Sequence, residues 1–415
     1  MSAYKVTVSP ILIGNTYSAP IDITHYLKGS GAISPVSASV DATDFSLGIF
    51  SYTYLKLNLM NYDRKLSGVN DPNSIFPSGR DRSMVTVTFP GFSFTGLISE
   101  EASRDADENL RLIVVSRESI IRKAVIAPGS IASGLKFSGA IESILSRHPI
   151  SSAISVDRSK INMELDLEIE NGAHFDGIKA EEAINQLLIA GNSYLYCDQN
   201  GVANVEPRIM KTAIKQNFFG PYDKLQRRPV ILSVKNYNDG RHRAFNSFLS
   251  GGTRVQDSAH IEEYSFREKT IETGFLRERS SVRKVLNNLL EKYKTPKIEM
   301  EITAPTVDTL NINVGDPVTI SYDRLRKPAI GEERIQKYGK VTYSQGRYPF
   351  SKGNIRVFDD TRFIVYGRKD RPQDFTTTLK VREYGYRPGD SVITTAPVTR
   401  VARYGQAIYG QDRYQ

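Results

Sequence analysis

The sequence is poor in the residues that mark disulfide-rich, metal-binding or thiol-dependent proteins. Its 415 residues include one cysteine, Cys197, five histidines and no tryptophan. A single cysteine excludes an intrachain disulfide, so the fold must depend on its core or on oligomerisation. Because Cys197 lies between tyrosines and a turn in YLYCDQNG, we expect a small strand residue rather than a nucleophile.

Patterns for metal binding are also missing. The histidines, at positions 25, 148, 174, 242 and 260, show no HxH or HxxxH spacing. The stretch RDADEN (104–109) places oxygen ligands at alternate positions, but it lacks the glycine and the later glutamate of a complete calcium loop. We therefore expect no metal site and interpret this stretch as a solvated turn.

No catalytic or nucleotide-binding motif is found. The chain has no GxSxG nucleophile elbow, no GxxxxGK[ST] phosphate loop and no GxGxxG fingerprint. Its carboxylates alternate with apolar residues in NMELDLEIE and KIEMEI, which is typical of the solvated face of a strand. The sequence favours a protein without a cofactor and without catalytic residues.

No apolar run approaches the roughly 20 residues that a membrane-spanning helix needs. The formal net charge is +9 and the pI about 9.3, but basic and acidic residues are interspersed, as in SRESIIRK and GRKDRPQDF. This distribution favours a mixed solvated surface, with nucleic-acid contact as the minor alternative.

Periodicity divides the chain into four parts. Residues 1–117 alternate like short antiparallel strands and predict a β-barrel. Residues 118–210 predict an α/β insert: a helix with Ser138 as N-cap, a strand over 160–171, and the stretch AEEAINQLLIAGNSYLYCDQNGVANVEPR, a helix followed by an Asn-Gly hairpin. Residues 211–366 predict a second β-barrel with a long helix ending before Pro296, and residues 367–415 a basic, tyrosine-rich tail or arm.

Two segments are longer and more polar than their own domains explain. The first is residues 61–80, a polar connection rich in Asn, Ser, Pro and Gly, which predicts a surface loop. The second is the tail, residues 370–415. In these segments we expect partner contacts at seven residues, which are Tyr62, Asp63, Arg64, Arg80, Tyr404, Tyr409 and Tyr414. The alternative is that both segments are merely flexible surface.

The order of these parts resembles the tail hub, or baseplate hub, proteins of tailed bacteriophages. IKAEEAINQLLIAGNSYLYCDQNGVANVEPR is similar to the middle segment of that family, and ILSVKNYNDGRHRAFNSF to the entry of its second barrel. VRKVLNNLLEKYKTPKIEMEITAP, followed by the Val314–Val318 turn VGDPV, resembles its helix-strand-turn-strand unit. The resemblance implies an α+β, mainly antiparallel fold: two barrel-like domains, a small α/β insert between them and a C-terminal arm.

The resemblance also implies a function. In hubs, three chains with two barrels each form a pseudo-sixfold ring, which adapts a hexameric tail tube to a trimeric spike or fibre. The implied partners are two further copies in a homotrimer, a tail tube or distal tail protein, a central spike or fibre protein, the tape-measure protein, and DNA passing through the channel during genome ejection. The implied location is the virion tail tip, after assembly in the host cytoplasm.

Two other classes stay open at this point. One is a cell-wall hydrolase of the tail tip, although no peptidase-like or lysozyme-like segment is visible. The other is a receptor- or glycan-binding tail protein. A trimer without peptidoglycan turnover supports the hub, whereas a lytic monomer or a glycan-binding monomer supports one of the alternatives.

Overall fold

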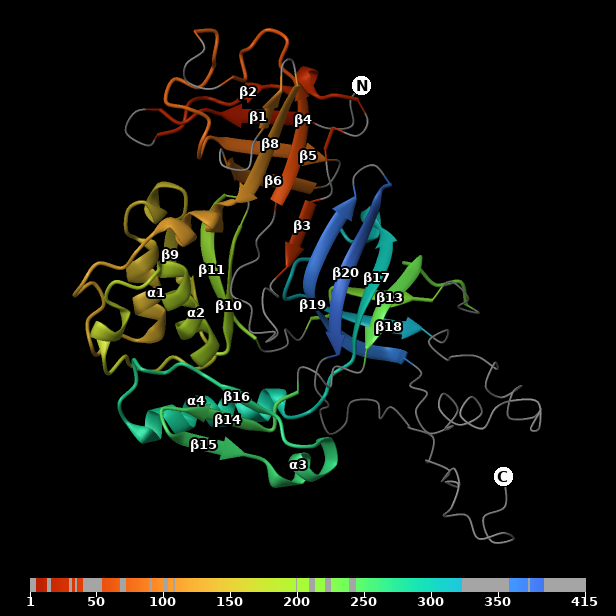
Figure 1. Ribbon diagram of the computed structural model, residues 1–415. Coiled ribbons are helices and arrows are strands. Elements are labelled where there is room, and N and C mark those ends of the chain that lie inside the picture. The colour runs from red at the N-terminus through yellow and green to blue at the C-terminus, as the bar shows by residue number, and fades with distance from the viewer. Residues whose placement is uncertain are drawn as a thin grey trace.

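The structure is a computed structural model that describes residues 5–12, 16–29, 32–33, 36–39, 54–67, 72–89, 92–99, 104–106, 109–198, 200–208, 213–220, 225–238, 244–322, 358–371 and 374–383. Most of its strands belong to one hydrogen-bonded sheet that curls into two barrel-like halves (Figure 1). The predicted fold class, mainly antiparallel α+β with two barrel-like domains, is confirmed. Within the described residues, no helix combines the length and the apolar character needed to span a bilayer.

The first barrel is built from strands whose apolar residues alternate inward. Leu55, Leu57 and Leu59 of YLKLNLM are fully buried, while the residues between them face outward. The strands pair in the order β2–β1–β5–β6–β8–β4, with β7 beside β8, and bridges from Leu27 and Ile33 to β4 bring the chain back around. The elements are β1 Lys5–Ser9, β2 Ile21–Asp22, η1 Thr24–Tyr26, β3 Val36–Ser39, β4 Tyr54–Met60, β5 Met84–Phe89, β6 Phe92–Ile98, β7 Arg104–Ala106 and β8 Asn109–Ser116.

The second barrel has the strand order β13–β17–β20–β19–β18–β12. It closes where the chain enters β13, because the N–H of Ile231 donates to the carbonyl of Phe219 at 2.8 Å. Its core is a separate cluster that includes Phe218, Met300 and Phe363. The elements are β12 Gln216–Phe219, β13 Ser233–Asn238, β17 Glu299–Pro305, η7 Thr306–Asp308, β18 Pro317–Tyr322, β19 Phe358–Arg371 and β20 Thr376–Glu383.

One strand, β19, joins the two barrels. Its first half pairs with β18 inside the second barrel, and its second half, Gly367–Asp370, pairs with Val36–Ser39 of β3. Strand β3 in turn pairs with β4 of the first barrel through Ser37 and Tyr54. The barrels are therefore connected by backbone hydrogen bonds and not by side-chain contact alone.

The strand structure extends into the segment that the sequence assigned to the tail. Strand β19 continues to Arg371, and β20 lies between β17 and β19 in the sheet. Leu379 and Val381 of TTTLKVRE are fully buried there. The prediction of a tail or arm that begins at residue 367 is wrong for 367–383, because the charged residues that made this stretch look tail-like alternate with core residues on a strand.

The α/β insert lies beside the first barrel (Figure 1). Its helix α2 and hairpin β10–β11 confirm the predicted helix and Asn-Gly hairpin, and Gly201 has φ +79° at the turn. Strand β11 also pairs in parallel with β9. The elements are η3 Arg117–Lys123, α1 Phe137–Leu145, η4 Ile150–Ser152, β9 Ser155–Ile161, η5 Gly172–Phe175, α2 Ala180–Ala190, β10 Ser193–Cys197 and β11 Val202–Pro207.

Two local predictions in the insert are wrong. Strand β9 ends at Ile161, and the alternating stretch that follows lies across the start of α1, where the N–H of Phe137 donates to Leu167 O at 2.9 Å. Ser138 is not the N-cap of α1: its N–H and hydroxyl both donate to Asp166, at 2.9 and 2.7 Å. The alternation of apolar and polar residues in 160–171 thus reflects packing against the N-terminus of helix α1 and not a strand along its whole length.

A layer of helices α3 and α4 and strands β14–β16, here called the lower layer from its place in Figure 1, completes the described part. Helix α4 packs on β14 and β15, and its buried residues Val285, Leu286 and Leu289 belong to the same core cluster as α1 and α2 of the insert. Apart from the boundary at residue 367, which β19 crosses, the four-part division of the chain stays a prediction. The elements are β14 Ser247–Ser250, β15 Thr253–Gln256, α3 Ser258–Tyr264, β16 Glu268–Thr270 and α4 Arg279–Tyr293.

Candidate assembly interface

The predicted contact residues of the loop 61–80 differ in their accessibility. Tyr62 is 60% exposed, and its ring centroid lies 5.6 Å from that of Tyr26. Asp63 accepts a hydrogen bond from the Tyr26 hydroxyl at 2.6 Å and pairs with Lys65 at 3.2 Å, and these donors lower the pKa of its carboxyl. Arg64 takes a left-handed conformation with φ 58° in the turn. Tyr62 is therefore accessible to a partner, and Asp63 anchors the loop.

Arg80 lies inside the protein. It is buried, and its guanidinium donates to the carbonyl of Leu66 at 3.3 Å. Leu66 and Phe76, from the same loop, lie in the core of the first barrel. The prediction of a purely surface loop is thus wrong for these positions, because two apolar residues and one cation of an otherwise polar segment turn inward.

The other three predicted contact residues, Tyr404, Tyr409 and Tyr414, lie outside the described residues. Their role as partner contacts stays a prediction.

A set of exposed apolar side chains marks one end of the second barrel. Leu232, Val307 and Phe375, here called the barrel tip, are 53%, 73% and 61% exposed. They lie at the same end of β13–β17–β20: Leu232 N–H donates to Thr303 O at 2.7 Å, and Thr306 N–H donates to Phe375 O at 2.8 Å. This end lies on the side of the second barrel that is nearer the first barrel (Figure 1).

Phe375 combines exposure with backbone strain. Its φ is 48°, a conformation that costs a bulky residue about 1–3 kcal/mol and that persists only where the surrounding structure enforces it. Large apolar side chains that stay in water on neighbouring turns are typical of a surface that another protein covers. The barrel tip was not predicted from the sequence, although a valine in APTVD and a phenylalanine in RPQDF stand out within turn-like sequences.

A buried polar network holds the barrel tip in place. Arg368 and Asp370 of β19 form a bidentate ion pair at 2.8 and 2.9 Å, and Arg368 also donates to Thr309 O at 2.9 Å. The Thr377 hydroxyl donates to Asp370 at 2.7 Å and lies 3.2 Å from the hydroxyl of Thr306. Because Gly367–Asp370 also pair with β3, this network lies at the connection between the barrels.

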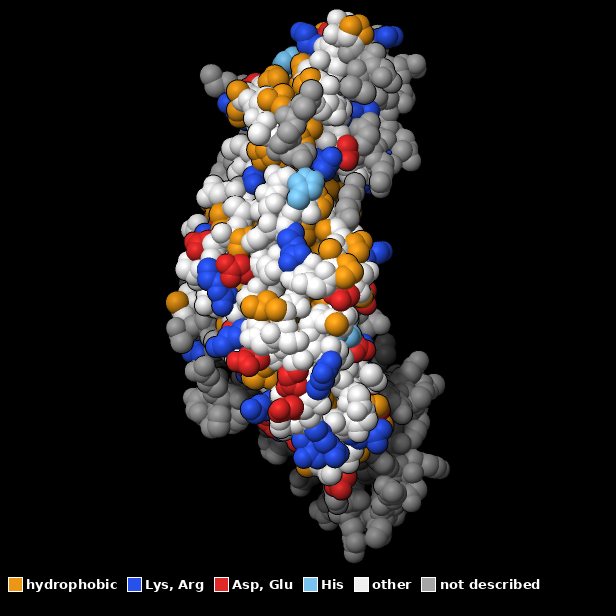
Figure 2. Space-filling model, turned by 90° about the vertical axis from the view of Figure 1, so that its left-hand side faces the viewer, with side chains coloured by type: hydrophobic (Ala, Val, Ile, Leu, Met, Phe, Trp, Pro, Cys, Tyr) orange, Lys and Arg blue, Asp and Glu red, His pale blue; other side chains and the backbone are white. Residues whose placement is uncertain are grey.

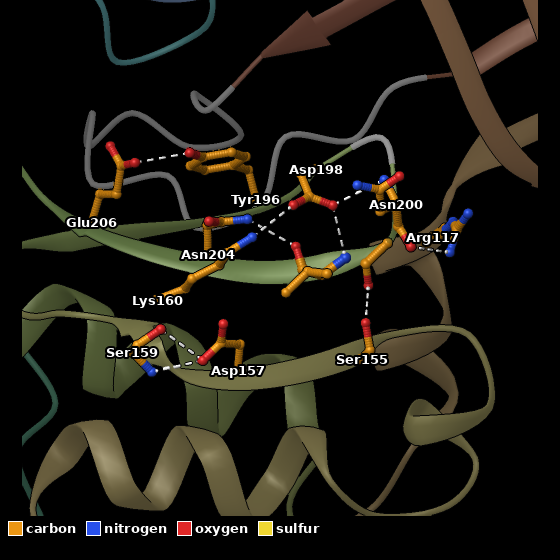
Figure 3. A network of polar contacts seen from close by, with 12 residues as sticks. Arg117, Ser155, Asp157, Ser159, Lys160, Tyr196, Asp198, Asn200, Asn204 and Glu206 are labelled. Atoms are coloured by element: carbon orange, nitrogen blue, oxygen red, sulfur yellow. Dashed lines mark hydrogen bonds and ion pairs between the residues drawn. The ribbon is translucent and has the colours of Figure 1, made fainter.

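The hairpin β10–β11 contacts the first barrel at its turn. Asp198 accepts from the backbone of Asn200 and pairs with Lys160 at 3.1 Å, while Arg117 donates to Asn200 O at 3.2 Å (Figure 3). Arg117 follows β8 and also contacts the sulfur of Met84 in β5 at 3.2 Å. A Cβ on Gly201 would lie 2.6 Å from Cζ of Arg117, so glycine permits this close approach.

The other end of the hairpin contacts the second barrel. Glu206 accepts hydrogen bonds from the hydroxyls of Tyr194 and Tyr196 at 2.7 and 2.8 Å (Figure 3 shows Tyr196 and Glu206). Burial and the Glu206 carboxylate raise the pKa of both phenols. The ring of Tyr194 packs against Gly315 of the VGDPV turn, whose N–H donates to Val365 O in β19 at 2.7 Å. The hairpin therefore braces both barrels.

Among the described residues, this arrangement includes neither a cluster of metal ligands nor a thiol whose pKa is lowered. The described part of the chain contains no group of three or more His, Cys, Asp or Glu placed to hold a metal ion. The backbone N–H of Cys197 donates to the buried carboxyl of Glu118 at 2.6 Å, and burial followed by the Glu118 charge raises the pKa of the thiol. A thiol held protonated is a poor nucleophile. The candidate interface is therefore a partly apolar surface, the barrel tip, on barrels that the hairpin contacts and supports.

The fold is shared with tail proteins of known structure, among them a prophage tail protein. No protein-family model and no curated protein sequence matches the chain. The tail protein from Neisseria meningitidis MC58 is 12% identical, with a TM-score of 0.56 over 92% of this chain and 96% of its own. The prophage tail protein gp18 from Listeria monocytogenes EGD-e is 11% identical, with a TM-score of 0.52 over 91% and 94%. The chain therefore has a tail-protein fold, which confirms the resemblance found in the sequence.

Proposed function

We propose that this chain is a structural hub protein of a bacteriophage tail that assembles as a trimeric ring. Each copy contributes two barrels, so three copies present six similar units around a central channel. Such a ring adapts a hexameric tail tube on one side to a trimeric spike or fibre on the other, and it leaves a path for DNA and the tape-measure protein. The role is structural, without a catalytic step.

The observation that carries the proposal is the connection of two barrels through one strand, β19. This connection, together with the hairpin brace, keeps the barrels at a defined separation within one chain. A ring of threefold symmetry with sixfold-like faces requires such a fixed separation, because otherwise the barrels of neighbouring copies would not meet in register.

The barrel tip is the proposed contact between neighbouring copies. Its three apolar residues are exposed in the single chain, and the Arg368–Asp370 network positions them beside the connection to the first barrel. Aromatic anchors of this kind contribute about 2 kcal/mol or more when they fill a pocket at an interface. We expect the basic C-terminal tail, with Tyr404, Tyr409 and Tyr414, to add contacts to a neighbouring subunit.

Light scattering of the full-length chain tests the oligomeric state, and electron microscopy of the same sample tests the ring. We expect a trimer with pseudo-sixfold faces and no turnover of purified peptidoglycan. A monomer that degrades cell walls would refute the proposal in favour of a hydrolase.

Phe375→Asn tests the contact. Asparagine tolerates a left-handed backbone, so the variant removes the ring without adding strain, and we expect the affinity of each contact between copies to fall about 30-fold. Phe266→Asn is the matched control, since Phe266 is 54% exposed and lies between α3 and β16, away from the barrel tip. Equal effects of the two variants would exclude the barrel tip as the contact.

A further inference from the structure

A half-open cavity of about 530 Å³ lies in the lower layer, apart from the barrel tip and the hairpin brace. It forms where the β14–β15 turn, the end of β16 and the first turn of α4 meet. Its size falls within the usual range for small-molecule sites. All of its lining residues belong to the described part of the chain, and neither the proposed ring contact nor the barrel cores use it.

Hydroxyl groups line the inner part of this cavity. Thr253 is only 5% exposed, yet its hydroxyl makes no hydrogen bond to any residue that the structure describes. Ser250 and Thr273, also buried, share one hydrogen bond of 2.7 Å, so the hydroxyl that accepts still has a proton to donate. These hydroxyls keep the capacity to exchange hydrogen bonds with a ligand or with water that enters the cavity.

Two arginines stand at the rim. Arg279, the first residue of α4, is exposed and forms no ion pair within the described residues. Arg277 also lines the cavity, and its guanidinium donates to Asn171 Oδ1 at 3.1 Å, close to the carboxylate of Glu170. Glu272 also lines the cavity, but its carboxylate accepts the N–H of Gly274 at 2.9 Å. Figure 2 shows Lys and Arg side chains gathered at the lower end of the molecule, beside acidic ones.

The start of helix α4 does not itself supply the binding groups. The backbone N–H groups of Arg277 and Glu278 both donate to Glu170 Oε2 at 2.5 Å, so that carboxylate already occupies the helix N-terminus. An anion at the cavity must therefore be bound by the arginine side chains. The turn opposite, Gly251–Gly252, has φ values of +50° and +76° and open space where a Cβ would lie, so its backbone is accessible to a ligand.

We propose that this cavity binds an anionic saccharide, a sugar unit that carries one phosphate or carboxylate group. The sugar hydroxyls exchange hydrogen bonds with Thr253 and with the Ser250–Thr273 pair, and the anionic group pairs with Arg279 and Arg277. Arginine suits this role because its planar guanidinium donates two parallel hydrogen bonds to a carboxylate or phosphate. Buried Leu276 and Val282 supply an apolar wall for the C–H face of the ring.

The test uses the full-length chain and isothermal titration with glucose 6-phosphate, glucuronate, glucose and inorganic phosphate. We expect at least one of the two anionic sugars to bind more tightly than glucose and than phosphate alone. Absence of binding by both anionic sugars at millimolar concentration would overturn the proposal. Phosphate binding as tight as that of glucose 6-phosphate would also overturn it, because the site would then recognise only the anion.

Two variants locate the binding site. Arg279→Gln removes an exposed charge, and Thr253→Val removes a hydroxyl at nearly constant shape. We expect losses of affinity of about tenfold and fivefold, respectively. Lys284→Gln is the matched control, since Lys284 is exposed on the same helix, does not line the cavity and undergoes the same charge change. Unchanged affinity in both cavity variants, or an equal loss in the control, would refute the assignment. The assay is independent of the ring, because it reads binding and not oligomeric state.

Discussion

Replacing Gly315 by alanine tests the brace between the hairpin and the second barrel. Gly315 has φ +91°, and a Cβ there would lie 2.6 Å from Cζ of Tyr194 and nearer still to its hydroxyl oxygen. Gly79 has the same φ of +91°, with nothing within 4 Å of an added Cβ. The pair Gly315→Ala and Gly79→Ala therefore separates the effect of overlap from the effect of backbone strain.

The magnitudes differ enough to measure. A non-glycine residue at this φ costs about 1–3 kcal/mol, which we expect for Gly79→Ala. Gly315→Ala adds an overlap that costs about 1–3 kcal/mol. It also displaces the Tyr194 hydroxyl from Glu206, a hydrogen bond to a charged group worth about 1.5–3 kcal/mol. We expect a total of about 3–6 kcal/mol for Gly315→Ala, since the contributions are not fully additive.

Urea unfolding followed by circular dichroism measures the loss, and hydrogen exchange over residues 193–207 locates it at the hairpin. Tyr194→Ala in the Gly315→Ala background removes the overlapping ring and should recover part of the stability. If Gly315→Ala is no more destabilising than Gly79→Ala, the packing of the hairpin on the second barrel is refuted.

Burial raises the pKa of the Glu118 carboxyl above its ordinary 4.5, so the folded protein loses stability as pH rises and the carboxyl loses its proton. Glu118→Gln should therefore raise the melting temperature at pH 7, with a gain that disappears near pH 4. A lower melting temperature at pH 7 would contradict this. Hydrogen bonds from His260 lower the pKa of Asp257 to about 2, so the carboxylate stabilises the fold above pH 4 and this stabilisation is lost as pH falls toward 2. Asp257→Asn should lower the free energy of unfolding by about 1 kcal/mol at pH 6. Thermal melts measure this loss, and the melting temperatures of the variant and the wild type should converge in acid. Arg368→Ala leaves Asp370 buried without its cation and should cost about 3–5 kcal/mol in urea unfolding, whereas its exposed neighbour Lys369→Ala should be neutral. Deleting residues 385–415 removes nothing from β20, so the circular dichroism spectrum should keep its β signal while light scattering shows weaker assembly; unchanged assembly counts against the arm.

Several elements could be predicted because their signals are local. Helices α2 and α4 follow from apolar residues at helical spacing, with Gly191 and Pro296 just beyond their ends. The β10–β11 hairpin follows from Asn200-Gly201, where the turn needs positive φ. The barrels follow from alternating strands, and the family resemblance gave their order along the chain.

Other features depend on partners that are distant in sequence. The alternation of 160–171 is equally compatible with a sheet and with packing on the start of α1, and only the fold decides between them. Arg80 looks like a surface cation until Leu66 is seen to accept its hydrogen bond. The contact between Tyr194 and Gly315 joins residues more than a hundred positions apart. Neither the hairpin sequence nor the VGDPV turn indicates by itself that the two will meet.

Strand β19 has one more consequence, for the way in which the protein unfolds. Since its residues supply ladder hydrogen bonds to β18 and β20 on one barrel and to β3 on the other, melting of either barrel removes partners from the strand that the other barrel shares. The two barrels should therefore unfold in a single cooperative transition. Force applied to one barrel should also be transmitted to the other through the shared strand and not through a flexible linker.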